Sequence, residues 1–451
     1  MNKSALAIAV AVGLLAQQAG AAGFIEDSKA TLKLRNFYIN TDNRDSGTKA
    51  ADAQSKVEEW GQGFQVDYTS GFTQGTVGFG IDAIALLGVR LDSGGGTNGA
   101  TSSSYGGTVF PSKSNGKAVD NYSSLGLTAK AKISETELRY GTLMPKLPVI
   151  SYNDGRLLPQ TFEGGQITSN EFKNLTLIGG QIEHVKGRNS SNNEQMSIGG
   201  ATTARTANSN KFLYAGADYK ITKDLLAQYY YGNQSEFYKQ HFLGLTHNWA
   251  IGPGVLKSDL RYFHSTDDGK NGHDWHYYSN GDYANSSRGN GKGKVDNNLI
   301  SGLFLYTVEG HTFGGGYQVS NGSSDFPFLN QGDGASAYIP TDMQISKFAR
   351  AGERTWQARY SYDFAKVGVP GLTAGAVYLR GDNIDTYGGG KQTSNGASEW
   401  ERDITVAYVI QEGALKNLGV MWKNAMWRND IAGQRDQDEN RLIVSYSIPL
   451  L

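Results

Sequence analysis

Residues 356–363 read WQARYSYD, and this stretch shows the pattern on which the fold prediction rests. Apolar or aromatic residues alternate with polar ones, which is the period-two signal of a strand with one apolar and one polar face. The same alternation occurs in residues 64–69 (FQVDYT) and 127–133 (LTAKAKI). Because most segments after residue 30 follow it, we predict an all-β protein.

Many of the apolar faces end in aromatic residues, which favours a membrane barrel over a soluble β-sandwich. A sandwich also alternates, with its apolar face inward. Barrels in bilayers, however, have aromatic girdles at both water interfaces, where one end of a Tyr or Trp ring is apolar and the other can hydrogen-bond. The aromatic residues concerned are Tyr68, Tyr140, Tyr219, Trp356, Tyr362, Tyr378, Tyr408, Trp422 and Tyr446.

Connections of two lengths alternate along the chain. Eight short ones lie near residues 70–75, 134–136, 170–174, 221–224, 250–254, 309–310, 366–370 and 411–416. Nine long ones, mostly polar, cover residues 40–58, 90–121, 144–164, 187–210, 232–239, 265–296, 320–352, 382–398 and 429–438. This count requires 18 strands with both termini on the short-turn side. Outer-membrane barrels have an even strand number, short periplasmic turns and long outer loops. We therefore predict a transmembrane antiparallel β-barrel of 18 strands, which leaves an aqueous channel.

The composition and the N-terminus agree with an exported envelope protein. The 451 residues include 59 Gly and no Cys, which rules out disulfides and thiol-ligated metal sites. With 42 Lys+Arg against 43 Asp+Glu there is no basic excess for nucleic acid. Lys3, an apolar run at 5–16 and small residues at 19–22 predict a signal peptide at residues 1–22. The alternative is a buried N-terminal helix. We expect residues 23–451 to form one barrel in the bacterial outer membrane.

Two long connections differ from the others in their apolar content. The third loop, residues 144–164, includes Leu147, Val149, Ile150, Leu157 and Leu158. An apolar loop is unfavourable in water, so we expect it to fold into the lumen and narrow the pore. The seventh, residues 320–352, is the second candidate, although a lid that packs on other outer loops explains its composition equally well.

Several further stretches together resemble one family. They are residues 23–28 (GFIEDS), 34–38 (LRNFY), 70–80 (SGFTQGTVGFG), 155–161 (GRLLPQT), 356–360 (WQARY), 368–371 (GVPG, followed by Leu372) and 441–444 (RLIV). Spread over the mature chain, they resemble the OprD-type outer-membrane porins of pseudomonads. The resemblance implies an 18-strand, substrate-selective channel for small solutes that usually have a carboxylate. It also implies an eyelet formed by the third loop with help from the seventh, and a ladder of basic residues along the lumen.

Strand parity predicts such a basic ladder independently of the resemblance. Its expected members are Lys130, Lys132, Arg139, Arg261, Arg359 and Lys423, with Lys33, Arg35 and Lys257 on the same polar faces. A row of cations lowers the barrier for an anion, provided that binding stays weak enough for release. The alternative is that these residues only make the lumen polar and pair with Asp67, Asp82, Glu137 and Asp363.

The expected eyelet residues are Tyr152, Asp154, Arg156, Tyr338 and Asp342, with Asp154 paired to Arg156. An aromatic ring can pack on the apolar part of this set while its carboxylate meets Arg156. We therefore favour aromatic or cyclic monocarboxylates as solutes. Basic amino acids, which need an acidic pocket, are the alternative.

Other functional classes find less support in the sequence. No Gly-x-Ser-x-Gly or His-Glu-x-x-His motif occurs, so we expect neither catalytic residues nor a metal site nor a cofactor. A barrel hydrolase and an adhesive barrel remain as alternatives, and the motif at 273–276 (HDWH) could at most bind a metal weakly. As partners we expect small carboxylate solutes, membrane lipid and lipopolysaccharide, no nucleic acid, and a monomer or weak trimer.

Overall fold

The computed structural model describes residues 23–44, 56–92, 108–113, 117–198, 208–271, 294–330, 336–388, 391–431 and 434–451. The predicted signal peptide at residues 1–22 and the motif at 273–276 lie outside these ranges. Within the ranges, no helix is long and apolar enough to cross a membrane.

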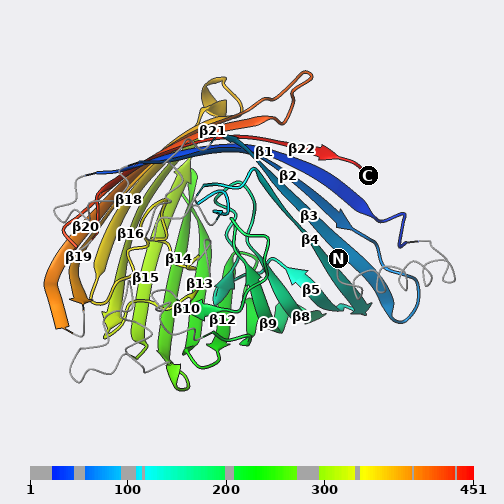
Figure 1. The fold of residues 1–451 in the computed structure, drawn as a ribbon, viewed down its shortest axis with the longest axis horizontal. Helices are drawn as coiled ribbons and strands as arrows, with labels where there is room; N and C mark the ends of the chain where they lie inside the picture. Colours follow the sequence, from blue (N-terminus) through cyan, green and yellow to red (C-terminus); the bar gives the residue numbers. More distant parts are fainter. Residues whose placement is uncertain are drawn as a thin grey trace.

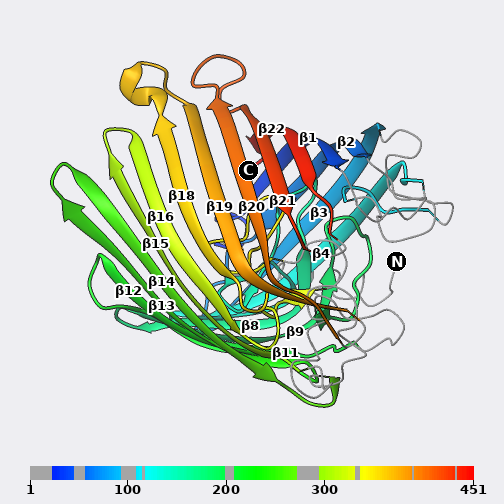
Figure 2. The same cartoon turned by 90° about the vertical axis from the view of Figure 1, so that its left-hand side faces the viewer.

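Eighteen antiparallel strands form one sheet that closes on itself. They are β1 (Lys29–Asn43), β2 (Lys56–Thr69), β3 (Gly78–Asp92), β4 (Asn121–Ile133), β5 (Thr136–Leu143), β8 (Thr161–Phe172), β9 (Leu175–Lys186), β11 (Phe212–Lys220), β12 (Leu225–Gln234), β13 (Tyr238–Ile251), β14 (Gly254–Asp267), β15 (Asp296–Val308), β16 (His311–Gly322), β18 (Arg354–Asp363), β19 (Leu372–Gly388), β20 (Lys391–Val409), β21 (Gly419–Asn429) and β22 (Gln437–Pro449). Closure occurs where β1 pairs with both β2 and β22, which lie beside it in Figures 1 and 2. The predicted 18-strand barrel is confirmed.

The apolar and polar residues that alternate along each strand lie on opposite faces of the barrel wall. In β18 the outward residues Arg354, Trp356 and Tyr360 are exposed, whereas Thr355 and Gln357 between them are buried. Exposed aromatics on the outside include Tyr140 and Tyr219. An apolar and aromatic outer face is what a barrel in a bilayer requires.

Within the described ranges, four short strands and one 3-10 helix lie outside the barrel sheet. β6 (Lys146–Leu147) pairs with β7 (Ile150–Ser151) within the third loop. β10 (Ser197–Ile198) pairs with β17 (Leu329–Asn330), which links two long connections. The 3-10 helix η3 (Phe364–Val367) lies in a short connection.

Two of the nine predicted long loops are wrong. Only residues 235–237 connect β12 to β13, and β19 and β20 run through most of residues 382–398. In the first case polar residues suggested a loop, but they lie at the ends of the two strands: Gln234 is buried on the inner face, whereas Asn233 and Lys239 are on the outer face. Polar composition alone therefore does not indicate a loop near the strand ends.

Buried apolar residues lie mainly inside the barrel, where the third loop (144–160) and the seventh loop (323–353) meet the wall. Leu157 and Leu158 pack with Phe37 and Ile39 of β1. Ile339 and Phe326 belong to a second cluster with residues of β11–β15 and the third loop, among them Phe263. Both loops thus contact the inner face of the wall, and Figure 1 shows the chain between β5 and β8 inside the barrel.

Candidate functional site

The third loop is held against β1 and β2. A Cβ atom at Gly63 would lie 2.9 Å from the carbonyl oxygen of Leu157, so only glycine allows this close approach. Beside it, Arg35 forms a bidentate pair with Asp154, with N–O distances of 2.7 and 3.0 Å. Arg35 also donates to the carbonyl oxygen of Arg156 at 2.8 Å. The expected pairing of Asp154 with Arg156 is wrong, because Asp154 binds the wall residue Arg35.

Arginines of the wall donate to carbonyl groups of the seventh loop. Arg261 donates to the carbonyl oxygen of Tyr338 at 3.1 Å, and its guanidinium lies 4.1 Å from the centre of the Tyr338 ring. Arg359 donates to the carbonyl oxygen of Pro340. Since Arg261 and Arg359 lie on the polar inner face of their strands, the seventh loop enters the lumen.

The two loops and the wall together enclose a cavity of about 550 Å³. The third loop contributes residues 152–156, and the seventh contributes residues 342–345 together with Ser336 and Lys347. Arg188, Asp403, Lys423 and Arg441 complete the lining. Five cations therefore face three carboxylates around this space.

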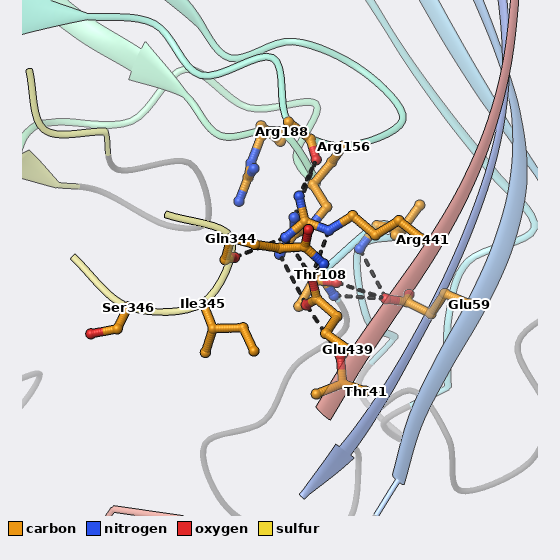
Figure 3. A network of polar contacts seen from close by, with 12 residues as sticks. Thr41, Glu59, Thr108, Arg156, Arg188, Gln344, Ile345, Ser346, Glu439 and Arg441 are labelled. Carbon is orange, nitrogen blue, oxygen red and sulfur yellow. Dashed lines mark hydrogen bonds and ion pairs between the residues drawn. The ribbon is translucent and has the colours of Figure 1, made fainter. Parts of the chain in front are cut away.

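A network around Glu439 forms one side of the cavity (Figure 3). Glu439 accepts from Arg441 Nε at 2.6 Å and from Gln344 Nε2 at 3.0 Å. Arg441 also donates to the carbonyl oxygens of Gln344 at 2.9 Å and Gly155 at 3.4 Å. Arg441 thus binds the third and the seventh loop to the same strand, and it fixes the spacing between them.

Arg156 keeps unused donor capacity beside this network. Its Nη2 lies 4.0 Å from Glu439, and its Nη1 donates to its neighbour's carbonyl at 3.1 Å. Its Nε is buried and has no hydrogen-bond partner among the described residues. A buried N–H without an acceptor is costly, so the position favours a bound anion or water. Lys423, likewise, makes no hydrogen bond within the described ranges.

A second cavity of about 240 Å³ also borders the third loop. Its lining includes Lys33, Arg35 and Ser447, and it shares Tyr152 and Asp154 with the larger cavity. Lys33 and Ser447 are close to the short-turn end of their strands. Tyr152 and Asp154 of the third loop therefore border both cavities.

The predicted ladder residues lie on the inner face, but most of them already have partners. Lys130 is buried, pairs with Asp82 at 2.7 Å and donates to the carbonyl oxygen of Ser70 at 2.7 Å. Arg139 pairs with Glu137 and Asp82, Lys132 lies 3.6 Å from Glu135, and Arg261 pairs with Asp259 at 2.7 Å. Only Lys423 of the six lines the larger cavity.

Of the predicted eyelet residues, Tyr152, Asp154, Arg156 and Asp342 line the larger cavity, and Tyr338 does not. Asp342 accepts from the backbone N–H of Ala337 at 2.9 Å and thus shapes the seventh loop. Sequence reasoning missed Arg188, Arg441 and Glu439. The alternation in β22 could have placed Arg441 and Glu439 inside, whereas no sequence signal marks Arg188.

Buried carboxylates support the loops from behind. Glu59 of β2 accepts the backbone N–H groups of Thr108, Val109 and Phe110 at 2.8, 3.0 and 3.2 Å. Phe110 in turn packs with Leu157 of the third loop. At the end of the seventh loop, burial raises the pKa of the Glu353 carboxyl well above its ordinary value, and the neighbouring Glu399 raises it further.

An 18-stranded membrane barrel whose lumen is constricted by inward loops is a porin. The family model described as "outer membrane porin, OprD family" matches residues 22–450. The chain belongs to the OprD family and lies in the outer membrane, as predicted. The short-turn end of the barrel is therefore periplasmic.

Relatives and solved structures agree over almost the whole chain. The chain is 36% identical to the "Porin-like protein GalP" of Pseudomonas putida, covering 96% of this chain and 95% of GalP. The crystal structure of Pseudomonas aeruginosa OccK8 (OprE) is 60% identical with a TM-score of 0.84, covering 95% of this chain and 100% of that one. The crystal structure of Pseudomonas aeruginosa OpdK with vanillate is 35% identical with a TM-score of 0.80 and the same coverage.

Proposed function

We propose that this porin is a passive channel selective for small carboxylates, and that aromatic or cyclic monocarboxylates are its preferred solutes. The observation on which this rests is Arg156, which lines a cavity together with four other cations and whose Nη2 approaches only Glu439, at 4.0 Å, among the described residues. An arginine with free donors suits a carboxylate because its planar fork matches the two oxygens.

The rest of the lining favours a solute with an apolar body. Tyr152, Met343 and Ile345 line the same cavity, and contact with apolar surface is favourable by roughly 25 cal/mol per Å². OpdK, a relative of similar fold, has been crystallised with vanillate, an aromatic acid. The acids Asp154 and Asp342 are engaged by Arg35 and by the seventh loop's own backbone.

One observation supports basic amino acids as the second candidate. Asp403 lines the cavity, and its Oδ1 is buried without a hydrogen-bond partner among the described residues. It could accept the ammonium group of an amino acid whose carboxylate meets Arg156. A hydrolase has no comparable support.

Uptake into liposomes containing the protein tests the proposal. Benzoate should enter faster than benzamide, its uncharged analogue of equal size, and faster than arginine. Arg156→Gln should slow benzoate by about tenfold, the scale of one charged hydrogen bond, and leave benzamide nearly unchanged. Arg44→Gln removes an arginine that pairs with Asp438 away from the cavity and serves as the matched control.

Two results would contradict the proposal. If Arg156→Gln slows benzoate and benzamide equally, Arg156 only holds the shape of the pore. If arginine enters faster than benzoate and Asp403→Asn abolishes that advantage, the channel is one for basic amino acids. Release of benzoate from benzoyl esters would instead indicate a hydrolase.

A further inference from the structure

The outer wall of β18–β21 has cationic side chains among its aromatic residues. Cross-strand pairing places Trp356, Arg380, Trp400 and Arg428 side by side in one row over the four strands, which are adjacent in Figure 2. Arg402 lies in the next row towards the periplasm, opposite Tyr378. These residues face away from the lumen, because they alternate with the inward residues of each strand.

The row lies at the height of the outer membrane interface. A strand crosses a bilayer in about 9–11 residues. Counted from the periplasmic end, Arg380 is the ninth residue of β19 and Trp400 the tenth of β20. Arg354 is the outermost residue of the ten-residue β18. Arginine is tolerated at such a depth because its cost falls to about 0–1 kcal/mol near the interface.

The guanidinium groups here are not neutralised within the described part of the chain. Arg354 and Arg380 are exposed, and no ion pair joins either of them to another described residue. Asp382 lies opposite Arg354 in the register without forming an ion pair. Arg402 reaches only the amide oxygen of Asn424, and its Nε has no described partner. Arg428, in contrast, is balanced by Asp438 at 2.6 Å.

The opposite wall is different at outward positions. β13–β16 present Leu243, Tyr262, Ile300 and Tyr317, which are all exposed and uncharged. β13 also has an outward cation, Lys239, but this one is paired with Asp268 at 3.0 Å. Among the described residues, the outward arginines without an ion pair lie on β18–β20, where rings such as Tyr378 and Trp400, with centroids 5.9 Å apart, lie between them.

We propose that Arg354, Arg380 and Arg402, with Trp356 and Trp400 between them, bind the phosphorylated headgroup of lipopolysaccharide in the outer leaflet. Guanidinium groups bind phosphate oxygens bidentately, and aromatic rings are favoured at headgroup depth. The lipid is the occupant because this surface faces the bilayer. A second copy docked symmetrically through the same face would bring like charges together.

Native mass spectrometry of the full chain in detergent, with bisphosphorylated lipid A and fully dephosphorylated lipid A as probes, tests the proposal. The wild-type protein should bind the bisphosphorylated form about tenfold more tightly, which corresponds to about 1.4 kcal/mol. Arg354→Gln with Arg380→Gln should remove this preference. Arg354→Lys with Arg380→Lys, which keeps the charge but loses the fork, should retain part of it. Lys366→Gln with Lys416→Gln removes the same charge from the exposed periplasmic turns of these strands and should change nothing.

Equal binding of the two lipid A forms by the wild type would overturn the proposal, as would an unchanged preference in the double glutamine variant. Displacement of lipid A by millimolar inorganic phosphate alone would show a site for free anions rather than for lipid. A change from trimer to monomer in the glutamine variant would show that the surface is a subunit interface instead.

Discussion

Gly63→Ala should disturb the eyelet from behind, because the third loop lies directly on this residue. The new Cβ would lie 2.9 Å from the carbonyl oxygen of Leu157 and 3.1 Å from its Cδ1. Ordinary contacts begin near 3.4 Å, so the backbone of a buried loop residue must move by about half an ångström. Overpacking of this kind costs about 1–3 kcal/mol.

The matched control is Gly315→Ala in β16, where a Cβ meets no atom within 4 Å. The same substitution there should be neutral or slightly stabilising, since it restricts the unfolded chain. Guanidinium unfolding in detergent measures the stability of both variants. Benzoate uptake should fall in Gly63→Ala alone, because Leu157 is the neighbour of Arg156. Equal unfolding midpoints and equal uptake for the two variants would refute the proposed contact between β2 and the third loop.

Three further predictions concern groups behind the eyelet. Glu59→Ala should destabilise the protein by about 2–4 kcal/mol, because three backbone N–H groups lose a charged acceptor; Glu58→Ala, on the outer face, is the control in the same unfolding assay. The pKa of Glu353 is raised in the folded state, so its contribution to the free energy of unfolding is present below the unfolded-state pKa and is lost as pH rises through the folded-state pKa. Glu353→Gln should therefore stabilise the protein at pH 7 and have little effect on stability at pH 4. Equal effects on stability at the two pH values would refute this. Lys130→Met should lower stability and leave the preference for benzoate over benzamide unchanged, whereas Lys423→Met should lower that preference in liposome uptake. The reverse result would show that Lys130 contacts the solute.

The architecture was predictable because a barrel wall repeats one simple constraint. Each strand must present an apolar face to lipid and a polar face to the lumen. The alternation of apolar and polar residues in 356–363 indicates these two faces. The apolar character of the third loop likewise indicated where it would go. The error at residues 232–239 shows where this reasoning stops, because the ends of two strands there contain polar residues on both faces and so have the composition of a loop.

The partners of the lumen residues could not be predicted in the same way. Parity places Lys130, Arg261 and Lys423 on the inner face, but it does not say which carboxylate or loop carbonyl each one reaches. Asp154 illustrates the point. Arg156 is only two residues away in the sequence, yet Asp154 binds Arg35, which is 119 residues away. Such pairings depend on how a loop crosses the lumen, and that is fixed by packing among Leu157, Phe37 and Phe110.

The loop backbones explain why so many inward cations are engaged. The third and seventh loops have little regular structure, so their buried N–H and C=O groups must find partners elsewhere. The wall provides them in two ways. Glu401 accepts N–H groups of Ile345 and Ser346 at 2.9 and 2.7 Å, while arginines such as Arg261 and Arg441 donate to loop carbonyls.

This division has a consequence for selectivity. A wall cation that donates to a loop carbonyl keeps its charge but has fewer N–H donors for a solute. It therefore contributes to the electrostatic potential in the lumen and not to direct hydrogen bonding with the solute. Among the described residues of the cavity, Arg156 and Lys423 keep unused donors for direct contact with a solute. Removing an anchoring arginine such as Arg441 should therefore impair every solute, because the spacing of the loops changes. Removing Arg156 should impair only solutes with a carboxylate, and comparing the two variants separates the construction of the eyelet from its recognition of charge.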